Sequence, residues 1–404
     1  MDVLGKPVFR IIKKVLALTA VLLHGIMFAN NPTDSSHSKQ TDLGDLFNRL
    51  SGKTGIKHPA HISRYHISAI PVIAYSLQTG VIGGVSGTLS ILPKDTGRHN
   101  VSNLIGTAAY TARDQRILML QSILWTKGNI YCFNGDLVYL FYPQKTFGLG
   151  TRTAKGDQFI LNSSHIRFYE TASRNVLPDL LIGGGYNLDY HWNITETKPT
   201  ERATDFEHYD PATKTVSSGF TLNLTYDSRR NVINPEPGVY ANVAWRNNLK
   251  ALGSTSKWQS LVIDLRKYLR LKKDSKNILA IWNYNCFTVK GKPPYLDLPN
   301  TTGDNSASSG RGYIQGRFRG KNMIYLESEY RFEISRNGLF GGVVFTNAQS
   351  LSEWPSNQFE AAKLGYGAGV RIKINKHSRT NIALDYGFGA GGSRGLFVNL
   401  CEMF

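Results

Sequence analysis

Apolar and polar residues alternate along the chain from about residue 68 to its last residue. In 363–375, for example, the even positions are mainly apolar and the odd positions are glycine or polar. A period of two is typical of β-strands, because successive side chains point to opposite faces of a sheet. The pattern predicts sixteen strands, at 68–78, 83–92, 101–113, 115–126, 129–142, 157–171, 180–194, 218–227, 238–248, 257–270, 277–290, 322–334, 339–349, 363–375, 379–388 and 395–404.

The length of these segments and the order of their connections favour a membrane barrel over a soluble sandwich. Most have ten or more residues, enough for a tilted strand to cross a bilayer, whereas soluble strands average about five to six. In the second half of the chain, short and long connections also alternate, as they do in outer-membrane barrels. The predicted fold is therefore all-β, a closed antiparallel transmembrane β-barrel whose even strand number places both ends on the periplasmic side.

The first 67 residues do not follow the alternation. Residues 1–29 resemble a signal peptide, with a basic start, an apolar stretch at Val15–Leu23 and a plausible cleavage site at Ala29. A membrane anchor is the alternative, but the stretch is shorter than the roughly 20 residues of a spanning helix. Residues 30–67 are predicted to be a periplasmic linker, and 68–404 the barrel domain. The linker is predicted to contain a short amphipathic helix, with apolar residues at Leu43, Leu46, Phe47 and Leu50. The alternative to a simple linker is a small plug of the lumen or a helix that docks in the periplasm.

Composition narrows the possible partners. The chain has 404 residues, 39 of them glycine, and a net charge of +18. Basic residues do not form runs, so we expect no nucleic-acid partner, and the charge suits an anionic lipid surface or an anion-attracting pore. The three cysteines do not have metal-site spacing, and neighbouring His58, His61 and His66 lack carboxylate or cysteine partners nearby. We therefore predict no metal and no cofactor.

The sequence does not favour an enzyme. It contains no G-x-S-x-G nucleophile motif. Paired carboxylates do occur at Glu327, Glu329 and Glu333, where acid–base catalysis is conceivable. Beside Arg331 on a lumen wall they are better explained as a charge network, which we expect to include Arg371 and Asp385 as well.

Several motifs occur together and in order in the second half of the chain. They are Tyr226-Asp227-Ser228-Arg229-Arg230-Asn231, Gly310-Arg311-Gly312-Tyr313, Glu329-Tyr330-Arg331-Phe332, Gly365-Tyr366-Gly367-Ala368-Gly369-Val370-Arg371, Leu384-Asp385-Tyr386-Gly387-Phe388-Gly389 and a terminal Phe404. With these motifs the chain resembles the BamA/TamA superfamily of outer-membrane barrels, also called the bacterial surface antigen family. The motifs support the resemblance over 218–404, and the strand pattern alone extends it to 68–217.

The resemblance implies a site inside the barrel. The long loop 291–321 would fold back into the lumen, and its Arg311, flanked by Gly312 and Tyr313, would pair with acidic groups on the inner wall. Glu329 is the expected partner. Where the family usually has an aspartate on the next strand, this chain has Asn347, so we expect a hydrogen bond there in place of an ion pair. Phe404 would be the C-terminal barrel signal on the apolar face of the last strand, although Glu402 departs from that signal.

The resemblance also implies a function. Family members that insert or export proteins carry POTRA domains, and residues 30–67 are too few for one, so the chain resembles a barrel-only branch. We expect a barrel in the outer membrane of a Gram-negative bacterium that assembles or transports proteins through a weak seam. Its partners would be outer-membrane lipid and either client barrel proteins or a periplasmic, POTRA-bearing protein. The alternative is a porin-like or structural barrel that passes small, preferably anionic, solutes.

Overall fold

The computed structural model describes residues 41–42, 45, 64–92, 100–198, 201–272, 275–304, 306–376 and 379–404. The predicted signal peptide, most of the predicted linker with the apolar face of its helix, and the candidate ligands His58 and His61 lie outside these residues. Of the predicted helix, the described residues cover only the start, at 41–42 and 45. There Asp42 and Asp45 each accept a hydrogen bond from the other's backbone N–H, at 2.9 and 3.2 Å.

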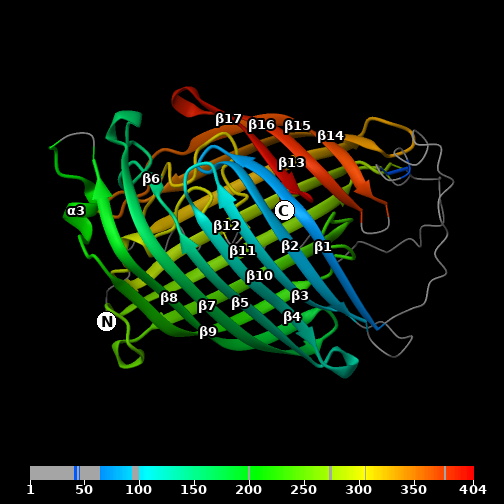
Figure 1. Cartoon of the computed structure of the whole chain (residues 1–404), viewed down its shortest axis with the longest axis horizontal. Coiled ribbons are helices and arrows are strands. Elements are labelled where there is room, and N and C mark those ends of the chain that lie inside the picture. Colours follow the sequence, from blue (N-terminus) through cyan, green and yellow to red (C-terminus); the bar gives the residue numbers. More distant parts are fainter. Residues whose placement is uncertain are drawn as a thin grey trace. The chain divides into compact units, whose positions relative to one another are not determined.

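Sixteen antiparallel strands form a closed barrel (Figure 1). The prediction of a closed antiparallel barrel is confirmed, and a short additional strand, β6 (Gln144–Thr146), pairs with β7 beyond the end of β5. The wall strands are β1 (Tyr65–Ser76), β2 (Gly80–Ile91), β3 (Ser102–Thr111), β4 (Arg116–Trp125), β5 (Tyr131–Phe141), β7 (Phe159–Leu177), β8 (Leu180–Thr197), β9 (Thr215–Asp227), β10 (Gly238–Asn248), β11 (Trp258–Arg270), β12 (Ile278–Gly291), β13 (Asn322–Glu333), β14 (Phe340–Leu351), β15 (Lys363–Asn375), β16 (Thr380–Gly389) and β17 (Ser393–Leu400).

Apart from Asp45, helical structure in the described residues is confined to one short α-helix and five 3-10 turns. These are α3 (Asp205–Tyr209), η1 (Lys127–Asn129), η2 (Lys155–Asp157), η3 (Lys250–Leu252), η4 (Tyr295–Asp297) and η5 (Ala390–Gly392). None of the described helices has the length and hydropathy needed to span a bilayer.

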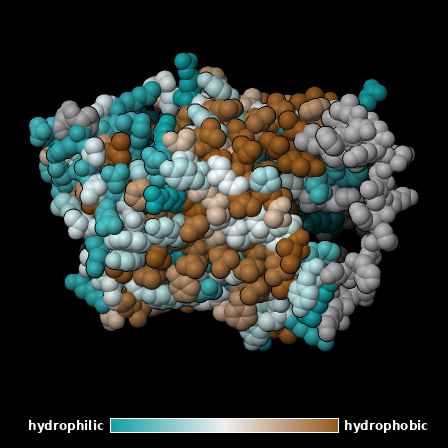
Figure 2. Space-filling view, viewed as in Figure 1, coloured by the Kyte–Doolittle hydropathy of each residue, from teal (hydrophilic) through white to brown (hydrophobic). Residues whose placement is uncertain are grey.

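The alternation of side chains sorts each strand into a lumen face and an outer face. In β13, Glu327 and Glu329 are fully buried, whereas the intervening positions are more open and Leu326 is 43% exposed. Large apolar side chains are similarly exposed on other strands, among them Ile67 and Leu364. Figure 2 shows apolar side chains gathered over much of the outer face, while the end of the barrel near α3 is mostly hydrophilic. An apolar outer band is what a lipid environment requires of a barrel.

The height of the wall varies around the barrel. β7 has 19 residues and β8 has 18, whereas β3 and β4 have 10 each. The connections at the α3 end also vary, because 292–321 is long whereas 77–79 and 112–115 are tight turns. The predicted alternation of short and long connections therefore does not extend to the first strands.

The predicted last strand, 395–404, is wrong over its final residues. β17 ends at Leu400, and Cys401 has a φ of 73°, a left-handed value that few non-glycine residues adopt. Met403 and Phe404 are buried in a cluster with Tyr268 and Trp282 of β11 and β12. The chain end therefore turns into the lumen, and the predicted place of Phe404 on the apolar outer face is wrong.

Candidate functional site

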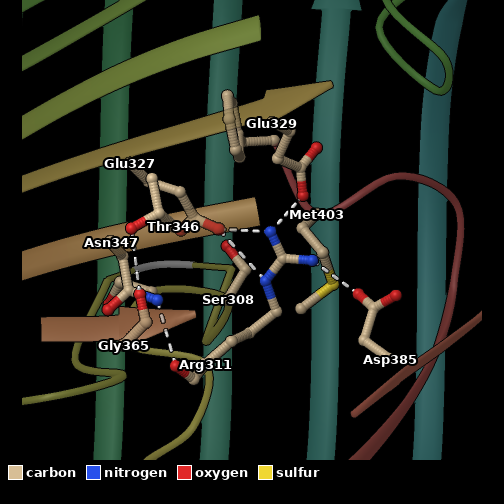
Figure 3. Close-up of polar contacts among 12 residues, drawn as sticks. Ser308, Arg311, Glu327, Glu329, Thr346, Asn347, Gly365, Asp385 and Met403 are labelled. Carbon is tan, nitrogen blue, oxygen red and sulfur yellow. Dashed lines mark hydrogen bonds and ion pairs between the residues drawn. The ribbon is translucent and has the colours of Figure 1, made fainter. Parts of the chain in front are cut away.

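Arg311 is the centre of a buried polar site inside the barrel (Figure 3). It belongs to the long connection between β12 and β13, and only 1% of its surface is exposed. Its guanidinium donates hydrogen bonds to Glu327 and Glu329 of β13 and to Asp385 of β16, the last with an Nη1–Oδ2 distance of 2.5 Å. Its Cζ atom lies 3.7 Å from the ring centroid of Phe345. The structure thus brings Arg311 and Glu329 together, and adds two further carboxylates.

Asn347 makes the expected hydrogen bond to Arg311, through the backbone of the loop. It lies directly opposite Glu327 in the β13–β14 register, but its Nδ2 donates to the backbone carbonyl of Arg311, at 3.0 Å. The third carboxylate that contacts the guanidinium is that of Asp385 in β16, two strands beyond the β14 strand of Asn347. The neutral residue at position 347 therefore fixes the loop backbone, and the charge balance of Arg311 does not depend on it.

Glycines let the loop lie directly on the wall. Gly312 has a φ of 99°, and a Cβ there would meet the backbone oxygen of Phe388 at 2.6 Å. On the wall side, a Cβ at Gly387 would meet the backbone nitrogen of Gly312 at 2.6 Å. Neither residue can carry a side chain without moving the loop. Next to them, Tyr313 donates to the Leu364 carbonyl and accepts from the Ala390 N–H, so it fastens the loop to β15 and η5.

Arg311 is one member of a closed circuit of ion pairs. Asp385 also pairs with Arg371 at 2.5 Å, and Arg371 pairs with Glu402 at 2.7 Å. Glu402 lies 3.8 Å from Arg331, which returns to Glu329 at 2.6 Å. We call this circuit the charge ring; its members are Arg311, Glu329, Arg331, Glu402, Arg371 and Asp385, with Glu327 attached through Arg311.

The charge ring pairs charges that are withdrawn from water. It contains three arginines and, with Glu327, four carboxylates, and every member is nearly inaccessible to solvent. Burial alone would lower the pKa of Arg311, but Glu327, Glu329 and Asp385 raise it well above its ordinary value. An ionised group in such a place needs paired partners, because desolvation of an isolated charge is costly. The connection 292–321 between β12 and β13 is called the inner loop below. The ring therefore joins the inner loop, β13, β15, β16 and the chain end into one electrostatic unit.

One member of the predicted network lies elsewhere, and one member of the charge ring was not predicted to belong to it. Glu333 lies apart from the charge ring, near the end of β13, where it pairs with Lys276 at 3.2 Å and remains partly exposed. Glu402, by contrast, completes the ring, although it was noted only as a departure from the usual C-terminal signal. Its position was the available clue, since a carboxylate among outward apolar residues needs another environment.

Phe404 is held by its backbone and by its ring. Nη2 of Arg331 donates to a backbone oxygen of Phe404 at 2.9 Å. The Phe404 ring lies 5.2 Å from that of Trp282 and 6.3 Å from that of Tyr268, between centroids. The terminal residue thus anchors the chain end within the lumen, next to the charge ring.

The seam where the barrel closes is the second feature of the site. Within the described residues β1 and β17 pair at a single position, Tyr75 with Val398, whereas β1 pairs with β2 at every residue from Tyr65 to Ser76. On the other side, β16 and β17 pair at eight positions, from Ile382–Leu400 to Gly389–Ser393. The first strand is therefore well paired with β2 and the last strand with β16, but the two strands hardly pair with each other.

Comparison with known proteins shows what this architecture resembles. A family model described as the Omp85 superfamily domain matches residues 127–391. Among solved structures, BamA from Haemophilus ducreyi lacking POTRA domains 1–3 is similar, with a TM-score of 0.56 and 14% identity, over 84% of this chain and 70% of that one. CdiB from Escherichia coli has a TM-score of 0.59 and 11% identity, over 85% of this chain and 63% of that one.

A third similar structure is CdiB from Acinetobacter baumannii, with a TM-score of 0.56 and 14% identity. It is covered over 60% of its length, and this chain over 84%. At these identities the likeness establishes a shared barrel fold. The chain spans between 60% and 70% of the length of the three solved chains. No curated protein matches the sequence.

Proposed function

The chain belongs to the Omp85 superfamily, and we propose that it assembles or translocates proteins at the outer membrane of a Gram-negative bacterium, with the β1–β17 seam as its working part. The observation that carries the proposal is the single pairing position of that seam. Its family supports the same conclusion. The partners we propose are outer-membrane lipid, client barrel proteins and a POTRA-bearing protein.

A weakly paired seam offers a template for another strand. Backbone N–H and C=O groups inside a membrane must find partners, since lipid supplies none. Over residues 66–74, one edge of β1 pairs with β2, and the described residues of β17 do not pair with the other edge. Pro71, which lacks an N–H, is a residue typical of edge strands. A client strand that adds to this edge gains main-chain hydrogen bonds, which is the mechanism of β-augmentation.

The interior supports the pore alternative less well. The inner loop buries Tyr295, Leu298, Tyr313 and Phe318 against the wall, and the charge ring fastens it from the other side. A porin-like barrel needs a continuous aqueous path. A lumen that a fastened loop occupies is a poor path for solutes, so assembly or translocation is the function that the geometry supports better.

The proposal is tested by locking the seam. Cys132, Cys286 and Cys401 are first changed to serine, and Tyr75→Cys and Val398→Cys are then introduced, because these residues are register partners. The barrel is reconstituted in liposomes, and a urea-denatured client barrel is added. We expect the reduced protein to accelerate client folding over empty liposomes, and the oxidised, cross-linked protein to lose most of that acceleration.

A matched cross-link within the wall controls for rigidity. Val85→Cys with Ala108→Cys joins register partners in β2 and β3, away from the seam. This pair should leave the acceleration unchanged in both redox states. The proposal fails if the oxidised seam variant is as active as the reduced one, or if the serine background never exceeds empty liposomes.

A further inference from the structure

A second buried polar cluster connects the inner loop to the opposite part of the wall. It consists of His165 on β7, Asp189 and His191 on β8, and Asp297 on η4 of the inner loop. His165 and His191 are directly opposite in the β7–β8 register, and their rings stack with centroids 4.0 Å apart and planes 12° from parallel. His191, Asp189 and Asp297 are almost completely inaccessible, and His165 is largely so.

The two carboxylates each hold one imidazole. Oδ1 of Asp189 lies 3.1 Å from Nε2 of His165, and Oδ1 of Asp297 lies 3.0 Å from Nε2 of His191. The other oxygen of Asp189 accepts from Arg246 at 2.6 Å and from the Tyr169 hydroxyl at 2.7 Å. Asp189 is therefore fixed with one oxygen turned towards His165, while Asp297 sets the orientation of the His191 ring.

One fully buried nitrogen in this cluster has no hydrogen-bond partner. Nδ1 of His191 is buried, and nothing in the described part of the chain donates to it or accepts from it. Because Nε2 of a neutral His191 donates to Asp297, the lone pair of the ring lies on Nδ1. A buried polar atom without a partner is costly, and a carboxylate behind the other nitrogen is the usual support of a metal-binding histidine.

We propose that His165, Asp189 and His191 bind a transition-metal ion such as Zn²⁺ or Cu²⁺. One ligand atom from each residue already lies within 4.8 Å of the other two. Bonds of about 2.0–2.2 Å in a tetrahedral site place ligand atoms only a little more than 3 Å apart. The 3.1 Å between Nε2 of His165 and Oδ1 of Asp189 meets this requirement. The His191 side chain would have to turn for its Nδ1 to complete the site.

The surroundings suit a divalent cation of this type. Two imidazoles with one carboxylate are ligands that Zn²⁺ and Cu²⁺ accept, whereas Mg²⁺ and Ca²⁺ prefer oxygen alone. Asp189 and Asp297 carry two negative charges against the single positive charge of Arg246, so the cluster with neutral histidines is net negative. The ion would join β7 to β8 and, through Asp297, strengthen the attachment of the inner loop to the wall.

The test is metal titration of the full refolded barrel in detergent. Zn²⁺ binding is measured by calorimetry, and Co²⁺ serves as a spectroscopic probe of the ligand set. We expect one Zn²⁺ per barrel, with His165→Ala and His191→Ala each weakening binding by at least about tenfold. His208→Ala is the matched control, since His208 is exposed on α3, and it should bind as the unchanged protein does.

Folding of each variant is checked by the heat-dependent shift of the barrel on a gel. His165→Gln retains a polar side chain beside Asp189 and replaces His165→Ala if that variant does not fold. The proposal is overturned if the unchanged barrel binds no Zn²⁺, or if folded variants at His165 and His191 bind it with unchanged affinity. This outcome would leave the proposed function untouched, because the seam experiment does not involve these residues.

Discussion

Arg311 shows, at the scale of a single residue, how much of the interior depends on one charge. Its guanidinium contacts Glu327, Glu329 and Asp385, and water has almost no access to any of the four side chains. Without it, three carboxylates would face one another in a poorly solvated space. Removing one partner of a buried ion pair destabilises a protein more than replacing the whole pair with apolar residues, because an uncompensated charge remains.

Arg311→Ala should therefore lower the free energy of unfolding by about 3–5 kcal/mol. Urea titration of the refolded barrel, followed by tryptophan fluorescence, measures the change. Arg152→Ala is the control, because the Arg152 side chain is 79% exposed and its contact with Glu360 spans 3.5 Å. An exposed pair of this kind contributes less than about 1 kcal/mol. Equal effects of the two substitutions would show that the charge ring does not stabilise the barrel.

At the scale of elements, the loop and the glycine-rich strands are complementary surfaces. β16 presents Gly387 to Gly312 with no side chain between them, and β15 presents Gly365 to the carbonyl oxygen of Arg311. The close approach brings the guanidinium within reach of Asp385. Glycine weakens an ordinary strand, so its presence here is explained by the loop that covers it.

Gly387→Ala should lift the inner loop off the wall, because the new Cβ would meet the backbone of Gly312 at 2.6 Å. Trypsin cleavage after Arg317 and Arg319, which are 8% and 1% exposed, then becomes faster. Gly83→Ala in β2 is the matched control, since nothing lies within 4 Å of a Cβ there. If both variants resist trypsin as the unchanged barrel does, the loop does not depend on the glycine contact.

The strands were predictable from the sequence, and the contacts between distant elements only partly. Alternation identifies the lumen face of Glu329 and Asp385, because lipid outside and polar groups inside impose a period of two. Alternation cannot show that both residues meet the same arginine, since this depends on how far the loop reaches across the intervening strands. It also gives no sign that the chain turns inward at Cys401, so the partners of Glu402 and Phe404 were missed.

The resemblance of the motifs supplied what the alternation lacked. It placed Arg311 in the lumen and pointed to Glu329 as its partner. It also led to the expectation that Asn347 would make a hydrogen bond in place of an ion pair. That hydrogen bond is present, but it goes to the backbone of Arg311, and Asp385 supplies a further negative charge to the guanidinium. The cluster of His165 and His191 had no such signal, because the two histidines are distant in sequence and become neighbours only through the β7–β8 register.

At the scale of the whole molecule, the barrel combines a fastened interior with a weak lateral closure. The inner loop is held on one side by the charge ring and on the other by Asp297, which also accepts from Ser217 at 2.5 Å. The wall, by contrast, closes at one pairing position among the residues that the structure describes. We therefore expect movement at the seam and not along the lumen, as the proposed role in assembly or translocation requires and a pore does not.

Single-channel conductance of the refolded barrel in a planar bilayer tests this difference most directly. We expect the inserted barrel to stay closed for most of the recording, because the inner loop remains fastened in the lumen. Rare openings should become more frequent in Arg311→Ala, where the loop has lost its central contact. Stable openings of the unchanged barrel, with a preference for anions, would instead support a solute pore and rule out a lumen closed by the loop.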